Sequence, residues 1–172
     1  LSDIEVIHEE KQGHLWVIQY PHEDNEEKNI IVATTRPETM FGDTAVAVHP
    51  DDERYKNLIG KKVRIPLTKK YIPIIADSAV DIEFGTGAVK VTPAHDMNDF
   101  EIGKRHDLER VLVINESGTM NENVPKQFIG LDRHECRKKL VQELIESGHL
   151  IETKDHDLSI GHCYRCNTII EP

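Results

Sequence analysis

Two carboxylates, a lysine and a threonine lie in one short stretch near the middle of the chain: Lys90, Thr92, Asp96 and Asp99. A lysine ammonium donates hydrogen bonds, carboxylates accept them, and a hydroxyl does both. These residue types at this spacing therefore predict a small polar pocket that could hold an ammonium group and a hydroxyl.

A strand followed by a helix would position these side chains. Within residues 85–100, a β-branched run stops at Pro93, which lacks the N–H that strand pairing needs. Asp96 is the expected helix N-cap with Asp99 three residues on, a pattern that is also typical of a first helical turn without further function. Lys90 favours the functional interpretation, because strand alternation places it on the same face as the threonine two residues later.

A second polar stretch lies between two apolar runs and contains Thr34, Thr35, Arg36, Glu38 and Thr39. Its hydroxyls can bond backbone or ligand with equal ease. Taken alone, the stretch is better explained as a hydroxyl-stabilised turn. Considered together with the first cluster, this stretch becomes a candidate site.

Composition limits the function classes. The chain has 172 residues, 38% of them hydrophobic, and a formal net charge of −10, which predicts one globular domain with poor affinity for a long nucleic-acid backbone. The chain could still bind a short single-stranded end of a nucleic acid. We expect no membrane segment and no signal peptide, and three cysteines without a disulfide framework indicate a reducing, cytoplasmic location. Because the chain begins at Leu1, we expect a piece of a longer protein.

Hydrophobic patterning predicts strands, a hairpin and helices. Runs 4–9 and 15–20 are the expected hairpin, with its turn at 10–13. Helices are expected over 50–58 and, capped by Asp132 with Glu135 completing a capping box, over 132–147, where Cys136, Leu140, Leu144, Val141 and Ile145 form the apolar stripe. The remaining strands are expected over residues 29–34, 43–49, 62–67, 71–76, 111–114 and 150–160, with a charged loop over 21–29.

Cys163 and Cys166 have the spacing of half a zinc site. Cys136 and His162 do not supply a second pair at a convincing spacing, so we expect either no metal within this chain or a partner pair that lies outside it. A redox motif is the alternative, but no helix start follows Cys163 to lower the pKa of its thiol.

Two longer motifs resemble a known family. Residues 33–45 (ATTRPETMFGDTA) resemble the threonine-rich motif of the editing domain inserted into class I aminoacyl-tRNA synthetases for valine, isoleucine and leucine. Residues 85–96 (GTGAVKVTPAHD), with Asp99, resemble its second motif. The lysine at position 90 resembles the valyl branch of this family, whereas the isoleucyl and leucyl branches typically carry His or Met at that position. Residues 161–172 resemble the valyl segment that leads back into the catalytic core.

The resemblance implies an α+β fold with a barrel-like, mostly antiparallel β-sheet and peripheral helices. It also implies that residues 1–172 are a single editing domain of a larger synthetase. Residues 161–172 would begin the return linker and carry half of a zinc-ribbon-like Cys-x-x-Cys. Met97 and His49 depart from the pattern of relatives, and neither removes a proposed functional group.

The implied activity is hydrolytic deacylation of threonine mischarged on the tRNA for valine. A hydrophobic pocket cannot strongly reject an isostere that adds a hydroxyl, a limit well known for valine and threonine, so a second site must hydrolyse the error. The implied partners are the 3′-terminal aminoacyl-adenosine and the rest of the synthetase chain. We expect no cofactor in this domain, since ATP and zinc would belong to the full-length synthetase.

The family pattern also implies residue roles. Asp99 would hold the α-ammonium, Lys90, Thr92 and Asp96 would recognise the threonine hydroxyl, and Arg36 with Thr39 would contact the terminal adenosine or the ester. Water is the expected nucleophile, and His95 is interpreted as structural. The catalytic candidates are thus Lys90, Asp96 and Asp99, and the substrate-binding candidates are Thr34, Thr35, Arg36, Glu38, Thr39 and Thr92.

Two other functions remain open from the residues alone. A metal-dependent phosphohydrolase would use His95, Asp96 and Asp99 and would lose activity with a chelator. A non-catalytic module would bind an RNA end without deacylation.

Overall fold

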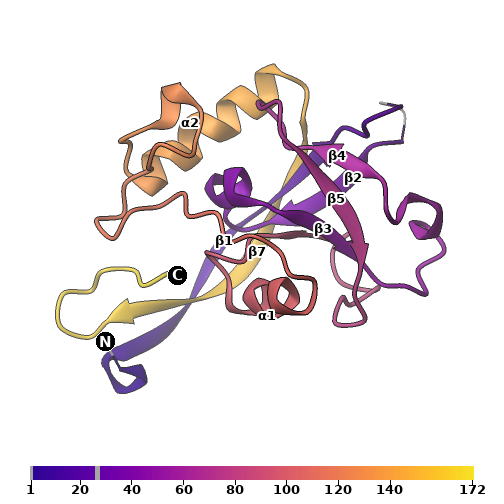
Figure 1. Ribbon diagram of the computed structural model, residues 1–172. Coiled ribbons are helices and arrows are strands. Elements are labelled where there is room, and N and C mark those ends of the chain that lie inside the picture. The colour runs from indigo at the N-terminus through magenta and orange to yellow at the C-terminus, as the bar shows by residue number, and fades with distance from the viewer. Residues whose placement is uncertain (1, 26–27) are drawn as a thin grey trace.

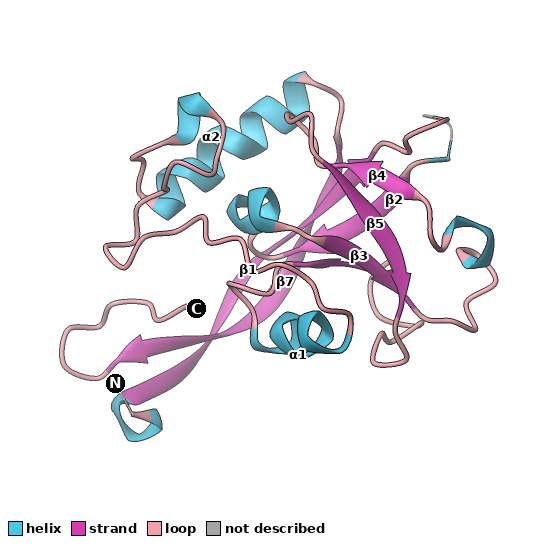
Figure 2. Ribbon diagram, viewed as in Figure 1, coloured by secondary structure: helices cyan, strands magenta, loops and turns pink. Residues whose placement is uncertain are grey.

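The computed structural model describes residues 2–25 and 28–172, so positions 26 and 27 of the expected loop lie outside it. The described strands form a three-stranded sheet in the order β2-β1-β7 and a four-stranded sheet in the order β4-β5-β3-β6 (Figures 1 and 2). The strands are β1 (Val6–Tyr20), β2 (Ile30–Thr34), β3 (Ala45–Val48), β4 (Lys62–Arg64), β5 (Tyr71–Ala76), β6 (Ala88–Val91) and β7 (Leu150–Cys163). The helices are α1 (Met97–Arg105), α2 (Arg133–Glu146) and the 3-10 helices Asp3–Glu5, Pro37–Gly42, Lys56–Leu58 and Lys126–Phe128.

The first sheet corrects the predicted N-terminal hairpin. β1 is one continuous strand that pairs antiparallel with β2 and, from Val6 to Ile18, with β7. Gly13, expected in a turn, lies opposite His156, and a Cβ at this position would collide with the side chain of Leu158. The glycine therefore allows close strand contact and does not reverse the chain.

The outer halves of β1 and β7 form a two-stranded arm that extends away from the body of the molecule (Figure 1). The N-terminus lies at the end of this arm, and the C-terminal segment turns back from it toward the body. Cys163, at the end of β7, pairs with Val6 near the start of β1. The arm thus brings the two ends of the described chain to the same side.

The second sheet is centred on β3, whose four residues are fully buried. β3 pairs parallel with β5 and antiparallel with β6, and β5 pairs antiparallel with β4. The strand predicted over 62–67 is shorter than expected, and Pro66 lies beyond it. The strand predicted over 111–114 is wrong: Ile114 makes only an isolated bridge to Met120, and the N–H of Val113 is bonded to the His95 ring.

The α+β class is confirmed. An isolated bridge between His22 and Val63 joins the chain after β1 to β4, and the hydroxyl of Thr86, before β6, donates to the carbonyl of Ile31 in β2. Both sheets therefore contribute to one large apolar cluster, and a smaller one lies between the second sheet and α1, but in the described part of the chain the ladders do not close into a barrel.

α2 packs on this core through Cys136, Leu140 and Leu144, as its predicted apolar stripe requires. Ile145, which was expected on the stripe, is 53% exposed. Asp132 caps the helix through the N–H of His134, whereas Glu135 pairs with Lys138 and does not complete a capping box.

The helix expected over 50–58 is limited to the 3-10 turn Lys56–Leu58. None of the described helices has the length and apolar composition that a membrane-spanning helix needs.

Candidate active site in a polar cavity

A cavity of about 640 Å³ lies where the chain after β2, the end of β6 and the start of α1 meet, a volume typical of small-molecule sites. The pairing of β3 with β6 places the two polar stretches of the sequence beside each other. Of the nine residues predicted as the site, eight line this cavity: Thr34, Thr35, Arg36, Thr39, Lys90, Thr92, Asp96 and Asp99.

Lys90 is the best-buried cation of the site, with a side chain only 7% exposed. Its ammonium nitrogen, Nζ, lies 2.9 Å from Asp43 Oδ1 and 3.0 Å from Thr39 Oγ1, and it also donates to the hydroxyl of Thr92. An ammonium has three protons, and these three partners use all of them. The charge of Lys90 is therefore held in a fixed position.

Asp43 and Tyr20 complete this network from beneath the cavity, and the sequence analysis did not identify either. Asp43 is fully buried; its Oδ2 accepts a 2.6 Å hydrogen bond from the Tyr20 hydroxyl, and its Oδ1 accepts one of 2.6 Å from Thr92. Burial raises the pKa of Asp43, while the neighbouring Lys90 ammonium opposes the rise. The available signal was an aspartate two residues before a wholly apolar strand, since a buried charge requires a partner.

Asp99 lies in the first turn of α1 and is 8% exposed. One carboxylate oxygen, Oδ2, accepts a 2.9 Å hydrogen bond from the backbone N–H of Thr92. The other, Oδ1, has no hydrogen-bond partner within the described chain, so it is available to a ligand. Burial raises the pKa of Asp99 to about 6, and the Lys90 ammonium opposes this shift, so the group is mostly ionised at pH 7.

Asp96 is the N-cap of α1, as predicted. Its Oδ1 accepts hydrogen bonds of 2.8 Å from the N–H of Asn98 and 3.0 Å from the N–H of Asp99. The cap therefore fixes the helix turn that carries Asp99.

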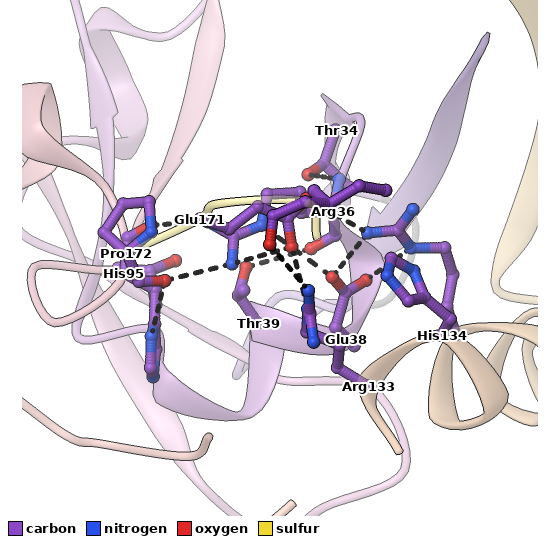
Figure 3. A network of polar contacts seen from close by, with 12 residues as sticks. Thr34, Arg36, Glu38, Thr39, His95, Arg133, His134, Glu171 and Pro172 are labelled. Carbon is purple, nitrogen blue, oxygen red and sulfur yellow. Dashed lines mark hydrogen bonds and ion pairs between the residues drawn. The ribbon is translucent and has the colours of Figure 1, made fainter. Parts of the chain in front are cut away.

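Arg36 and Glu38 lie two residues apart in the same motif, and their side chains meet in one polar network (Figure 3). Arg36 lines the cavity and donates a 2.7 Å hydrogen bond to the backbone carbonyl of His95. Glu38 is fully buried and accepts two hydrogen bonds, of 2.8 and 2.6 Å, from Arg137 on α2. The structure thus places Glu38 outside the cavity, although sequence reasoning grouped it with the substrate-binding residues.

The family model described as "Leucyl-tRNA synthetase, editing domain" matches residues 51–156. The chain belongs to this editing-domain family. The membership supports a proofreading role.

Curated relatives of the editing domain are valine–tRNA ligases. Those of Geobacillus stearothermophilus, Bacillus subtilis and Clostridium tetani are 61%, 59% and 56% identical to it over 172 residues. The match covers 100% of this chain and 19% of each relative, so the chain spans about a fifth of their length.

A solved structure shows the same fold. It is described as the ternary complex of Agrobacterium radiobacter K84 agnB2 LeuRS-tRNA-LeuAMS, and it matches with a TM-score of 0.63 at 20% identity. The match covers 94% of this chain and 24% of that one.

Phe84 is a further cavity residue of the editing domain that sequence reasoning missed. It lines the cavity and leaves 57% of its surface exposed. The ring directly precedes Gly85, Thr86 and Gly87, and an aromatic side chain beside such a turn was the available signal. An exposed ring at a polar cavity provides a flat surface for stacking.

His95 is part of the framework of the editing domain, as its structural interpretation requires. Its Nε2 accepts a 3.0 Å hydrogen bond from the N–H of Val113, which leaves Nδ1 as the donor to the carbonyl of Pro172 at 3.2 Å. Burial lowers the pKa of the ring, so it is neutral at pH 7. Both nitrogens are engaged, and neither is available as a base.

The phosphohydrolase alternative requires a set of metal ligands. Within residues 2–25 and 28–172, no three His, Cys, Asp or Glu side chains are arranged to hold a metal ion. His95, Asp96 and Asp99 each bond to a different part of the backbone. The Cys163 thiol is buried and the Cys166 thiol is exposed, next to the Thr168 hydroxyl.

Proposed function

We propose that the editing domain hydrolyses the ester bond between threonine and the 3′-terminal adenosine of the tRNA for valine. The observation that carries this proposal is the placement of Asp99 and the Lys90 network in one cavity with Thr39. Family membership supports the proofreading role, and the identity with valine–tRNA ligases supports the choice of tRNA.

The α-ammonium of the amino acid is expected to bind Asp99. The free Oδ1 atom of this carboxylate can accept a charge-assisted hydrogen bond, which is stronger than a neutral one. Because the pKa of Asp99 is about 6, the anchor is charged at neutral pH.

The threonine hydroxyl is expected to bind at the Lys90 network. The hydroxyl oxygens of Thr39 and Thr92 each accept from Lys90 and donate inward, to the Arg36 carbonyl and to Asp43. A hydroxyl oxygen has two lone pairs, so each retains one acceptor position for a donor on the ligand. Valine has no donor and would leave these buried groups without a partner, which disfavours its binding.

The terminal adenosine is expected to stack on Phe84, since aromatic side chains stack on nucleic-acid bases. Arg36 lies on the same cavity and would contact the ester or the ribose. The described cavity residues include no nucleophile paired with a free base. Hydrolysis therefore uses a water molecule that the cavity orients toward the ester carbonyl.

We also propose that residues 1–172 act as one editing domain of a longer chain. Residues 161–172 would begin the return linker, and Cys163 and Cys166 would form half of a zinc-ribbon-like motif. The turn of the C-terminal segment from the arm back toward the body supports this division (Figure 1).

A deacylation assay tests the proposal. The chain is incubated with threonyl and valyl esters of the valine tRNA, each with and without a chelator. We expect selective release of threonine that the chelator does not inhibit. Inhibition by the chelator would favour a metal-dependent hydrolase, and no release at any enzyme concentration would favour a pure RNA-end binding module.

A further inference from the structure

Five charged side chains from the 34–39 motif, α2 and the C-terminal segment form a compact cluster next to the cavity (Figure 3, which labels Arg36, Glu38, Arg133 and Glu171). We call it the arginine cluster, and its side chains are between 0 and 20% exposed. Its members are Arg36, Glu38, Arg133, Arg137 and Glu171.

Arg36 is the member of the arginine cluster that also lines the cavity. Its Nη1 donates to the His95 carbonyl at 2.7 Å, and its Nη2 donates to the Pro172 carbonyl at 3.1 Å and lies 3.6 Å from Glu171 Oε2. Its Nε is buried without a hydrogen-bond partner, 3.8 Å from Glu38 Oε1. The C-terminal segment therefore supplies two of the four groups that contact the guanidinium.

Glu171 is the carboxylate that bridges all three arginines. Its Oε2 accepts a 3.2 Å hydrogen bond from Arg133 and lies 3.6 Å from Arg36, while its Oε1 lies 3.9 Å from Arg137. Glu38, by contrast, accepts both of its hydrogen bonds from Arg137. Glu171 is thus the carboxylate that directly ties Arg36 to Arg133.

The net charge of the arginine cluster explains why the contact of Glu171 with Arg36 matters. Three arginines and two glutamates leave the arginine cluster with one net positive charge. Loss of the Glu171 charge would leave a second uncompensated positive charge among side chains that are at most 20% exposed, where like charges repel strongly. Arg36 has the cavity on its open side, so it is the arginine that can move away.

We propose that Glu171 is a positioning residue for Arg36. It holds the guanidinium at the cavity wall in the orientation that meets the 3′ end of the substrate. This role rests on the proposed deacylation, and it makes the segment after β7 part of the editing site. Local folding of the C-terminal segment and the activity of the cavity are then coupled through Arg36, which contacts both the Glu171 carboxylate and the Pro172 carbonyl.

Kinetics in the 172-residue chain test this role with Glu171→Gln, which keeps the size of the side chain and removes its charge. We expect kcat/KM for deacylation of threonyl-tRNA to fall about tenfold, the order expected for one charge-assisted contact. The same substitution in an Arg36→Ala background should cause no further loss. An equal loss in both backgrounds would show that Glu171 acts on stability and not through Arg36, and would overturn the proposal.

The matched control is Glu5→Gln. Glu5 pairs with Arg165 at 2.6 Å and likewise connects the C-terminal region to the rest of the fold, but it has no contact with Arg36. Removal of the Glu5 charge should leave kcat/KM for deacylation unchanged. A loss as large as that of Glu171→Gln would mean that any loosening of the C-terminal region is sufficient, which contradicts a specific role.

A readout independent of activity separates this inference from the proposed function. In the ¹⁵N-labelled chain, NMR of the Arg36 side chain should show slow rotation of the guanidinium in the parent and faster rotation in Glu171→Gln. Unchanged rotation would overturn the inference. If the parent fails to release threonine, the proposed function fails, but the NMR comparison still decides whether Glu171 holds Arg36.

Discussion

Lys90 and Asp43 form an ion pair whose contribution is orientation and not stability. Both groups lose their solvation, and the attraction between them roughly offsets that loss. Removal of one partner is different, because the remaining charge stays buried without compensation. The pair therefore fixes the ammonium that organises the Thr39 and Thr92 hydroxyls.

Substitution Asp43→Asn is expected to lower the free energy of unfolding by about 3 kcal/mol and to reduce the preference for threonyl over valyl ester. Urea denaturation and paired deacylation rates measure the two effects. Glu53→Gln is the control, since Glu53 is 81% exposed and its pair with Lys56 should contribute less than about 1 kcal/mol. Unchanged selectivity in a folded Asp43→Asn variant would contradict the role of the ion pair.

Asp99 should have opposite effects on stability and on binding. Its pKa is raised from 3.8 to about 6, so the folded protein binds this proton more tightly than the unfolded chain. The parent therefore loses up to about 3 kcal/mol of stability as the pH rises from about 4 to about 6, because the buried group must ionise. Asn has no charge to bury.

We accordingly expect Asp99→Asn to melt at a higher temperature than the parent at pH 7.5 and at a similar temperature near pH 3.5. Deacylation by the parent should decline as the pH falls through about 6, where the anchor for the ammonium becomes neutral. Thermal melts and a pH–rate profile provide the check. A less stable Asp99→Asn variant at pH 7.5 would show that the ionised form is favoured in the fold.

At the level of elements, strong local signals gave correct predictions. Pro93 ends β6, and Asp96 caps α1, because both effects depend on backbone hydrogen bonds within a few residues. The turn predicted near Gly13 and the strand predicted over 111–114 were wrong, because partners far along the chain decide those segments. The family resemblance predicted that the two motifs share one site. The pairing of Lys90 with Asp43 could not be predicted, because it depends on the register between β3 and β6.

The two helix caps allow a matched comparison. Asp96→Ala and Asp132→Ala should each lower the free energy of unfolding by about 1 kcal/mol, since each removes one N-cap. Only Asp96→Ala should also slow deacylation, because its cap fixes the turn that carries Asp99. Asp96→Asn should retain activity, since asparagine is also a good cap; activity as low as that of Asp96→Ala would assign the Asp96 carboxylate a direct role on the substrate.

At the level of the whole molecule, the acidic balance limits how tRNA can bind. The chain has 31 acidic residues against 21 basic ones, and Arg36 beside the cavity is already paired with carboxylates. A single-stranded end that enters the cavity satisfies this limit, because it needs few phosphate contacts. An extended tRNA backbone would require a basic surface.

The salt dependence of the affinity for tRNA therefore indicates how many tRNA phosphates this chain contacts. If phosphates of the 3′ end contact one or two Lys or Arg side chains, the slope of log Kd for valine tRNA against log salt concentration should be about 1 to 2. The matched ligand is threonyl-adenosine, which lacks phosphates and should show no slope. A slope of about 6 or more would mean that this acidic chain binds several phosphates of the tRNA body, against the charge argument. A small slope with tRNA and none with threonyl-adenosine would locate recognition at the esterified end, where Asp99 and the Lys90 network lie.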